Sequence, residues 1–394
     1  MKTVITGGRI VTEQEVLTGY DLLIEDGRIK KIAVNGEITG NPGEIIDVQG
    51  SFVMPGIIDI HSDMIENYIQ PRSTAVMDFE FGLREAEKTL AMCGITTIFH
   101  SISMFRDGTW DVKEIRKAPK VRRLAKLIKD HEKKRHLIHN RYHLRYEIDN
   151  LSCYDEVKEM IEEGDVDLLS FMDHSPGQGQ YQDLDIYRRH LPGEGDNLTE
   201  EEFAALVKQE SEKKTVSFQR LKELSDLAGE YKISVASHDD DSLSKLSLNQ
   251  KLGVKISEFP ITLDVAREAA DRGLLTVLGA PNILLGGSHS GNLSALDAIR
   301  AGAASVLVSD YYPQSLLQAV FYLYGTSETT LVDAVRLVSL NPAKAAGIDH
   351  ITGSIAEGKL ADLLIISEEE KVPELRAVFA EGKKIIDCHY RPGN

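Results

Sequence analysis

The sequence predicts an α/β protein in which a (β/α)8 barrel is joined to a small discontinuous β-sandwich domain. Short strands with glycine turns occur at both ends of the chain, and apolar runs alternate with helical patterns between them. Such alternation indicates parallel βαβ units. The 394 residues are enough for one large barrel and a minor domain. We expect the β-sandwich in residues 1–54 and 346–394 and the barrel in 55–345.

The barrel prediction depends on eight candidate strands. They are 57–61, 95–101, 141–148, 166–172, 233–237, 254–259, 274–279 and 304–309. Helical patterns such as "DEVKEMIEEG" lie between most of them. Eight strand–helix units favour a closed barrel, whose active site lies at the carboxyl ends of the strands. A doubly wound open sheet is the alternative, and it is disfavoured because no GxGxxG follows an early strand.

Composition and charge exclude several classes of function. The chain has 45 Lys and Arg against 62 Asp and Glu, a net charge of −17. Such an acidic chain is a poor candidate for binding nucleic acid or anionic membranes. Its three distant cysteines are typical of a reducing compartment, and no apolar stretch is long enough to span a bilayer. We therefore expect a cytoplasmic protein with neither nucleic-acid nor membrane partners, and a homo-oligomer stays open.

Histidines and carboxylates follow the apolar runs where the predicted strands end. They are His61 and Asp63, then His143, Arg145 and Glu147, then Asp173 and His174, then His238, Asp239 and Asp240, and finally Asp310. A single histidine after a strand is usually structural. Several histidines and carboxylates at successive strand ends instead resemble the ligands of a divalent metal. The sequence thus predicts a metal site with one ion or, as we favour, two.

Longer strings resemble a known family. "MPGIIDIHSD" and "NPAKAAGI…GSIAEGKLADLLII" are similar to the ends of amidohydrolase superfamily barrels. "FMDHSPGQGQY", "ASHDDD", "GAPNILLGGSHSGNLSA" and "LVSDYYP" resemble the PhnM family of phosphonate catabolism, and the resemblance covers essentially the whole chain. It implies metal-dependent hydrolysis of a ribosyl alkylphosphonate 5-triphosphate to the 5-phosphate and pyrophosphate, in the carbon–phosphorus lyase pathway. The implied partner is therefore a small phosphorylated ribosyl phosphonate.

The resemblance also implies roles for the strand-end residues. The metal ligands would be His61, Asp63, Glu147, His174 and His238, and Asp310 would be the general base, a metal ligand or both. The superfamily usually has His-x-His on its first strand, whereas this chain has a carboxylate at the second position, which shifts preference toward Mn²⁺ or Mg²⁺ relative to Zn²⁺. The metal stays open among Mn, Mg, Zn and Fe.

Two residues have more specific expected roles. The superfamily often bridges its metals with a carboxylated lysine, but no lysine ends the third or fourth strand, so Glu147 is the candidate bridge. Asp239 and Asp240 either orient His238 or cap a helix, and we give both equal weight.

The glycine-rich string "GGSHSGN" follows the seventh strand, where barrel loops commonly hold phosphate. A plain tight turn is the alternative. The candidate substrate-binding residues are Arg72, Arg145, Gly287, Ser288, His289 and Ser290. Each arginine could equally form a structural salt bridge. The basic run 116–136 reads as a solvated helix face, and the polar stretch 175–215 as a lid or a surface excursion, of which we favour the lid.

Two other functions compete with this prediction. A C–N hydrolase, such as a cyclic amidase or a deaminase, would use the same barrel, because fold does not fix function. Such an enzyme would not need the glycine-rich loop with arginines nearby. A non-enzymatic scaffold is the second alternative, and the full set of strand-end ligands disfavours it.

Overall fold

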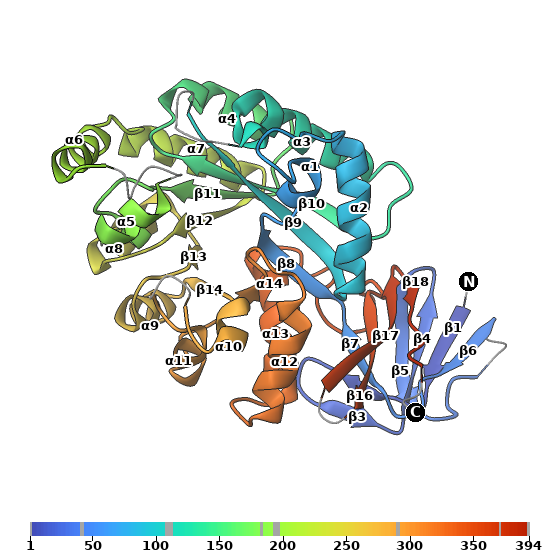
Figure 1. Cartoon of the computed structure of the whole chain (residues 1–394). Coiled ribbons are helices and arrows are strands. Elements are labelled where there is room, and N and C mark those ends of the chain that lie inside the picture. The colour runs from blue at the N-terminus through green and yellow to red at the C-terminus, as the bar shows by residue number, and fades with distance from the viewer. Residues whose placement is uncertain are drawn as a thin grey trace.

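The computed structural model describes residues 2–39, 43–106, 113–181, 184–191, 198–288, 292–369 and 372–391. Its centre is an eight-stranded parallel sheet in the order β8 to β15 (Figure 1). The strands are β8 (Ile57–Ser62), β9 (Ile95–Met104), β10 (His139–Glu147), β11 (Leu168–Met172), β12 (Ser234–His238), β13 (Ile256–Glu258), β14 (Leu275–Gly279) and β15 (Val306–Val308). A parallel bridge between Ser62 and Asp310 brings the two edges together. Each strand overlaps a predicted one, and the barrel is confirmed.

Helices surround the barrel. They are α2 (Phe79–Met92), α3 (Ala118–His131), α4 (Tyr154–Glu162), α7 (Phe218–Glu230), α8 (Leu243–Leu252), α9 (Leu263–Asp271), α11 (Ala295–Arg300), α12 (Ser315–Gly325), α13 (Leu331–Val338) and α14 (Leu340–Ala345). Many begin at a side-chain cap, as Ser217 does for α7 and Thr262 for α9. Their apolar faces pack on the outside of the strands, while Ile58, Phe99 and Val277 help to fill the barrel interior.

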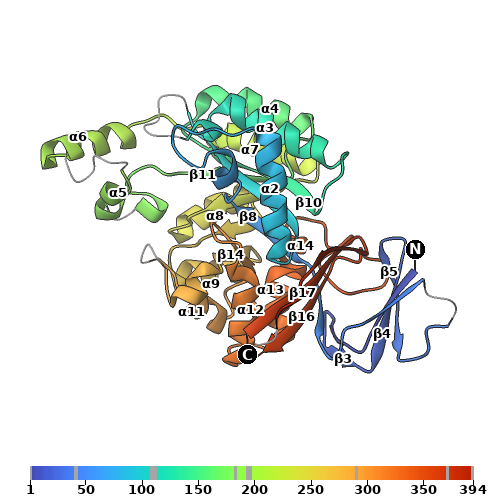
Figure 2. The same cartoon turned by 45° about the vertical axis from the view of Figure 1, so that its right-hand side comes forward.

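Short elements stand at the strand ends. They are α1 (Glu66–Ile69), the 3₁₀ turns η1 (Glu114–Arg116), η2 (Leu151–Cys153) and η3 (Gly179–Tyr181), and α10 (Pro281–Leu285). Two further helices, α5 (Leu184–His190) and α6 (Glu200–Ser211), follow η3. The stretch 175–215 is thus partly helical, and Figure 2 shows α6 projecting away from the barrel.

Strands from both ends of the chain form two further sheets. One has the order β5-β4-β1-β6 and the other β18-β17-β16-β7-β2-β3. Their strands are β1 (Lys2–Thr6), β2 (Arg9–Val11), β3 (Val16–Thr18), β4 (Tyr20–Glu25), β5 (Arg28–Val34), β6 (Glu44–Asp47), β7 (Phe52–Pro55), β16 (Leu363–Glu369), β17 (Val372–Ala380) and β18 (Lys383–Asp387). Because β7 pairs with both β2 and β16, it joins the two ends of the chain in one sheet.

Neither a membrane-spanning helix nor a disulfide bond occurs in the described part of the chain. Across the part of the chain that the structure describes, no helix is long and apolar enough to cross a bilayer. Cys93, Cys153 and Cys388 form no disulfide bond.

Candidate active site

A cavity of about 310 Å³ lies at the carboxyl ends of the barrel strands. Six of the predicted site residues line it: Asp63, Arg145, His174, His238, Ser288 and Asp310. Arg116, Tyr181, Asp239, Asn282 and Asn292 add polar groups, and Phe259, Leu278 and Leu293 add apolar ones. The folding of the barrel therefore brings together side chains that are up to 247 positions apart in the sequence.

Beneath this cavity, one carboxylate binds two imidazoles. Glu258, at the end of β13, accepts a hydrogen bond from Nδ1 of His61 at 2.9 Å and from Nδ1 of His238 at 3.2 Å. Ser170 Oγ donates a third at 2.8 Å. Burial alone would raise the pKa of Glu258, but its electrostatic interactions with His61 and His143 and the hydrogen bonds from His238 and His61 hold the pKa well below its usual value. Glu258 is therefore a carboxylate, and both imidazoles donate from Nδ1.

The opposite nitrogen of His61 has no partner. Nε2 of His61 is buried without a hydrogen bond in the described structure, although a buried polar atom normally has one. Burial also lowers the pKa of His238 well below its usual value, so this imidazole is neutral. A neutral imidazole with a free nitrogen is a ready metal ligand.

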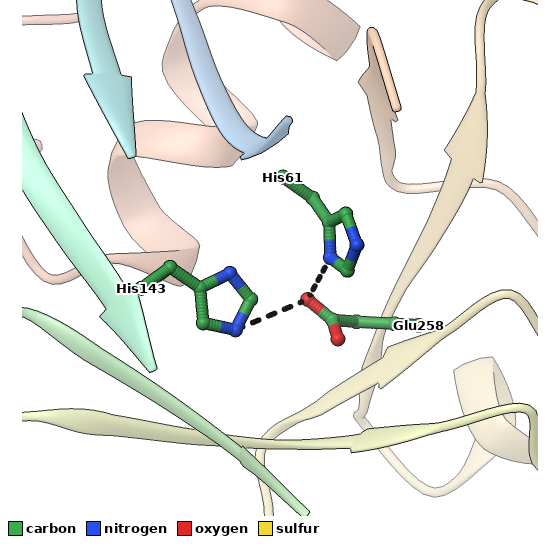
Figure 3. Close-up of side chains that lie close together, drawn as sticks. All are labelled: His61, His143 and Glu258. Carbon is green, nitrogen blue, oxygen red and sulfur yellow. Dashed lines mark hydrogen bonds and ion pairs between the residues drawn. The ribbon is translucent and has the colours of Figure 1, made fainter. Parts of the chain in front are cut away.

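His143 completes the buried cluster that Figure 3 shows with His61 and Glu258. Its Nε2 lies 2.5 Å from Ser170 Oγ and 3.8 Å from Glu258, and its Nδ1 lies 3.0 Å from the carbonyl oxygen of Ile60. Burial lowers the pKa of His143 to about 3. The potential ligand atoms of His61, His143 and Glu258 lie within 4.8 Å of one another. Because both nitrogens of His143 already have hydrogen-bond partners, we interpret this histidine as a structural neighbour of the cluster and not as a metal ligand.

A second group of potential ligands consists of His174, His238 and Asp239, again within 4.8 Å of one another. Burial raises the pKa of Asp239 to about 6, and its buried Oδ2 has no hydrogen-bond partner in the described part of the chain. His174 directs Nδ1 at both oxygens of Glu147, at 2.9 and 3.0 Å. Burial alone would lower the pKa of His174, but Glu147 raises it above its usual value.

Glu147 and Asp240 lie behind this group. Glu147 lines a smaller adjoining cavity of about 170 Å³ and is bonded to His174, so the structure does not bring the expected bridging carboxylate to the main cavity. Asp240 accepts from Ser237 at 2.6 Å and Ser257 at 2.5 Å. Ser242 caps α8 instead, so neither Asp239 nor Asp240 has the capping role.

The seam between the first and last strands positions two more carboxylates. The backbone N–H of Asp63 donates to the carbonyl of Asp310 at 2.9 Å, and that of Asp310 donates to the carbonyl of His61 at 3.0 Å. Asp310 adopts a positive φ of 58°, which is uncommon for a residue with a side chain. Burial raises the pKa of Asp63 above its usual value. Both carboxylates line the main cavity.

Two arginines reach the cavity with different surroundings. Arg116 donates from Nε to Glu66 at 2.6 Å and lies 3.4 Å from Asp63, so it is largely neutralised. Sequence reasoning missed Arg116 because it opens the basic run that we interpreted as solvated, and its partner is 50 positions away. Arg145 is only 9% exposed, and its side chain has no hydrogen bond or ion pair to any residue that the structure describes. No local sequence signal distinguishes these two cases.

The other expected phosphate contacts are less well placed. Arg72 lies on an exposed turn, bridged to Ala75, and does not line the cavity. The N–H of Gly287 donates to the carbonyl of Asn282 at the end of α10, so it is not free for an anion. Ser288 lines the cavity, whereas His289 and Ser290 fall outside the described residues.

The donor set fits a divalent metal. The cavity and its floor combine imidazole nitrogens with carboxylate oxygens, which suit Zn, Mn, Fe and Mg to different degrees. Two of these buried atoms, His61 Nε2 and Asp239 Oδ2, have no hydrogen-bond partner among the residues that the structure describes. Such atoms are unfavourable unless something positive or a donor completes them.

The chain is similar to amidohydrolases in both sequence and fold. The model of the Amidohydrolase family matches residues 201–386. An alpha-D-ribose 1-methylphosphonate 5-triphosphate diphosphatase of Escherichia coli (strain K12) is 31% identical, over 97% of this chain and 100% of its own. A dihydroorotase of Bacillus thuringiensis (strain Al Hakam) is 38% identical over 66 residues, 17% of this chain and 15% of its own. The L-hydantoinase of Arthrobacter aurescens has a similar fold, with a TM-score of 0.67, 14% identity and coverage of 98% and 96% of the two chains.

Proposed function

The chain belongs to the PhnM family of the amidohydrolase superfamily, and on this premise we propose that it hydrolyses a ribosyl alkylphosphonate 5-triphosphate to the 5-phosphate and pyrophosphate. Similarity to the Escherichia coli diphosphatase over the full length of both chains supports this substrate class. The superfamily consists of hydrolases that typically bind divalent metals, which agrees with the ligand groups in the barrel.

The observation that most supports the proposal is the position of Arg145, which is buried beside the cavity with its Nε unpaired among the described residues. A buried guanidinium whose N–H groups lack hydrogen-bond acceptors is unfavourable in the free protein. Arg145 makes no hydrogen bond or ion pair with a described residue, although Asp63 and Asp239 attract its charge from farther away, and it lines the cavity. A bound phosphate would supply both the negative charge and the acceptor oxygens that a guanidinium fork needs. Because the whole chain carries a charge of −17, local positive charge is required to attract a polyanion.

The metal would be held by residues of both ligand groups. We propose His61 of the first group and His174, His238 and Asp239 of the second, together with Asp63, which lines the same cavity, while Glu147 acts through Nδ1 of His174. A bound divalent metal lowers the pKa of water and neutralises charge on phosphoryl oxygens.

The remaining steps fall to the protein's own side chains. Arg145 binds phosphate oxygens and orients the triphosphate in the cavity. Asp310 faces the same cavity, so its carboxylate can accept the proton of the attacking water. Phe259, Leu278 and Leu293 line the wall and exclude further water. Water attacks the phosphorus nearest the ribose, and pyrophosphate leaves as a unit.

The test is hydrolysis in ¹⁸O-labelled water with Mn²⁺, Mg²⁺ or Zn²⁺ supplied separately. We expect the label in the ribosyl 5-phosphate and none in pyrophosphate. A parallel panel of cyclic amides tests the C–N hydrolase, for which a neutral substrate would leave Arg145 unpaired. Turnover of a cyclic amide without turnover of any triphosphate would overturn the proposal, and label in pyrophosphate would show that a different bond breaks.

A further inference from the structure

We infer that Glu258 is a positioning residue that holds His61 and His238 by their Nδ1 atoms and thereby directs both Nε2 atoms to the metal. The inference rests on the proposed metal dependence but not on the identity of the substrate. Glu258 carries this role because it joins imidazoles from two separate strands, β8 and β12.

The hydrogen bonds set the protonation of both rings. Oε1 of Glu258 accepts from His61 at 2.9 Å, and Oε2 accepts from His238 at 3.2 Å. A carboxylate only accepts, so each Nδ1 must carry the proton. A neutral imidazole has a single N–H, and its Nε2 therefore keeps a lone pair for a metal. A carboxylate that fixes the tautomer of a ligand histidine in this way is a recurring feature of metal sites.

Glu258 and the two imidazoles are buried, so no solvent molecule can take over the hydrogen bonds that its carboxylate accepts. Glu258 is 0% exposed, His61 1% and His238 6%. Ser170 Oγ donates to Oε2 at 2.8 Å and fixes the rotation of the carboxylate. The ring of Phe259 packs edge-on against both imidazoles, with centroids 5.0 Å from His61 and 5.2 Å from His238. The two imidazoles are thus held in nearly parallel planes, 21° apart.

The carboxylate of Glu258 therefore contacts ligand histidines from two different parts of the proposed metal centre. His61 belongs to the seam that carries Asp63 and Asp310, because the N–H of Asp310 bonds to its carbonyl. His238 belongs to the other ligand group, with His174 and Asp239. Loss of Glu258 should therefore weaken ligation on both sides.

The decisive variant is Glu258→Gln. The new amide has one oxygen and one NH₂ group, so it can accept from only one imidazole. The NH₂ group would face Nδ1 of the other imidazole, which would move its proton to Nε2 and remove that nitrogen from metal binding. Loss of such a supporting contact typically weakens metal affinity about 10- to 100-fold. We expect a weakening in this range when metal-free protein is titrated with Mn²⁺ or Zn²⁺ against a competing chelator.

Glu87→Gln is the matched control. Glu87 is 3% exposed and accepts from Nε2 of His131 at 3.1 Å, but it lies outside the metal centre. The same substitution there should lower stability and leave metal affinity unchanged. Equal weakening in both variants would mean that Glu258 acts only through stability, and unchanged affinity in folded Glu258→Gln would overturn the inference.

A second measurement needs no change at Glu258. In metal-free wild-type protein with ¹⁵N-labelled histidine, we expect His61 and His238 to be protonated at Nδ1 only, with assignments from single histidine variants. Protonation at Nε2 would overturn the inference even if Glu258→Gln does not fold. Failure of the proposed metal dependence is distinguishable, because wild-type protein would then bind no divalent metal at all. Failure of the proposed substrate would appear only in the hydrolysis assays and would leave the protonation of His61 and His238 as expected.

Discussion

Two arginines on one strand show how a residue's surroundings reveal its task. Arg141 and Arg145 both lie on β10. Arg141 donates to Asp167 at 2.9 Å, which is an ordinary structural ion pair at the foot of the strand. Arg145, four residues nearer the cavity, is more deeply buried and has no such partner among the described residues. Because buried guanidinium N–H groups without acceptors oppose folding, this arrangement favours a ligand that supplies acceptor oxygens and negative charge.

We expect Arg145→Gln to raise the KM for the triphosphate about 10- to 100-fold, with a smaller effect on kcat. The reason is the loss of one charge-assisted hydrogen bond, worth about 1.5–3 kcal/mol. The melting temperature should change little, since no hydrogen bond or ion pair between described residues is lost. Arg141→Gln is the control and should leave KM unchanged. Steady-state kinetics of both variants measure this, and an equal KM in wild type and Arg145→Gln would mean that Arg145 does not bind substrate.

His100, which does not line the cavity, should make the stability of the protein depend on pH. Burial lowers the pKa of His100 to about 4, and its Nε2 lies 2.9 Å from Asn140 Oδ1. An unfolded histidine has a pKa of about 6.5. Between these values the unfolded chain binds the additional proton, so stability falls as the pH drops below about 6.5. The expected loss is about 2 kcal/mol on going from about pH 8 to about pH 5.

Urea unfolding of wild type and His100→Gln at these two pH values measures that loss. The variant should lose less stability than wild type, because it lacks the titrating group. His136→Gln, at an exposed histidine, should behave like wild type. If wild type and His100→Gln lose equal stability, another group is responsible for the acid sensitivity.

At the scale of elements, the strands could be predicted and some of their contacts could not. The eight barrel strands are apolar runs bounded by turns, and the same runs placed His61, His238 and Asp310 at strand ends. Glu258 escaped notice because β13 has only three residues and a single acid in "VKISEFP" resembles a solvent-facing position. Arg116 escaped because its environment depends on α1, which lies far away in the sequence. Local patterns indicate elements, whereas partners across the barrel require the closed fold.

The 3₁₀ turn η3 makes a close approach to the cavity. Gly179 has a φ of 51°, and a Cβ there would lie 2.9 Å from Cβ of Asp239. Its N–H donates to Asp241 at 2.8 Å. Nearby Gly177 also has a positive φ, 83°, but a Cβ there would meet nothing within 4 Å. Substitution of either glycine strains the backbone, but only substitution of Gly179 would also push against Asp239. Comparison of the two variants therefore distinguishes strain from steric displacement of Asp239.

We expect Gly179→Ala to lower kcat/KM at least about tenfold, because small displacements of site residues can cost up to about 100-fold. Gly177→Ala carries comparable backbone strain and should leave kcat/KM near the wild-type value. Kinetics are to be measured with circular dichroism as a check on folding. Equal losses in the two variants would show that strain in this turn, and not contact with Asp239, limits activity.

On the scale of the whole molecule, one face of the terminal sheets packs into the hydrophobic cluster that surrounds the barrel, although the sheets also enclose a buried cluster of their own. Phe52 of β7 is 2% exposed and belongs to the same buried cluster as the barrel residues Ile95 and Leu144. Its ring meets Phe321 of α12 edge-on, with centroids 5.9 Å apart. The guanidinium of Arg9 lies 3.6 Å above the same ring. We therefore propose that residues 1–54 and 346–394 unfold together with the barrel, although they form separate sheets.

Phe52→Ala tests this shared core. Removal of a buried phenylalanine costs about 3–5 kcal/mol, and the loss should lower a single calorimetric transition that contains both parts. Phe81→Ala changes a phenylalanine that is 51% exposed on α2, so it should shift the transition by no more than about 0.5 kcal/mol. Two transitions, of which Phe52→Ala moves only one, would show that the sheets and the barrel unfold independently. If both parts unfold in a single transition, a substitution that destabilises the terminal sheets also destabilises the barrel. Such a substitution would then lower the fraction of folded protein that can bind metal.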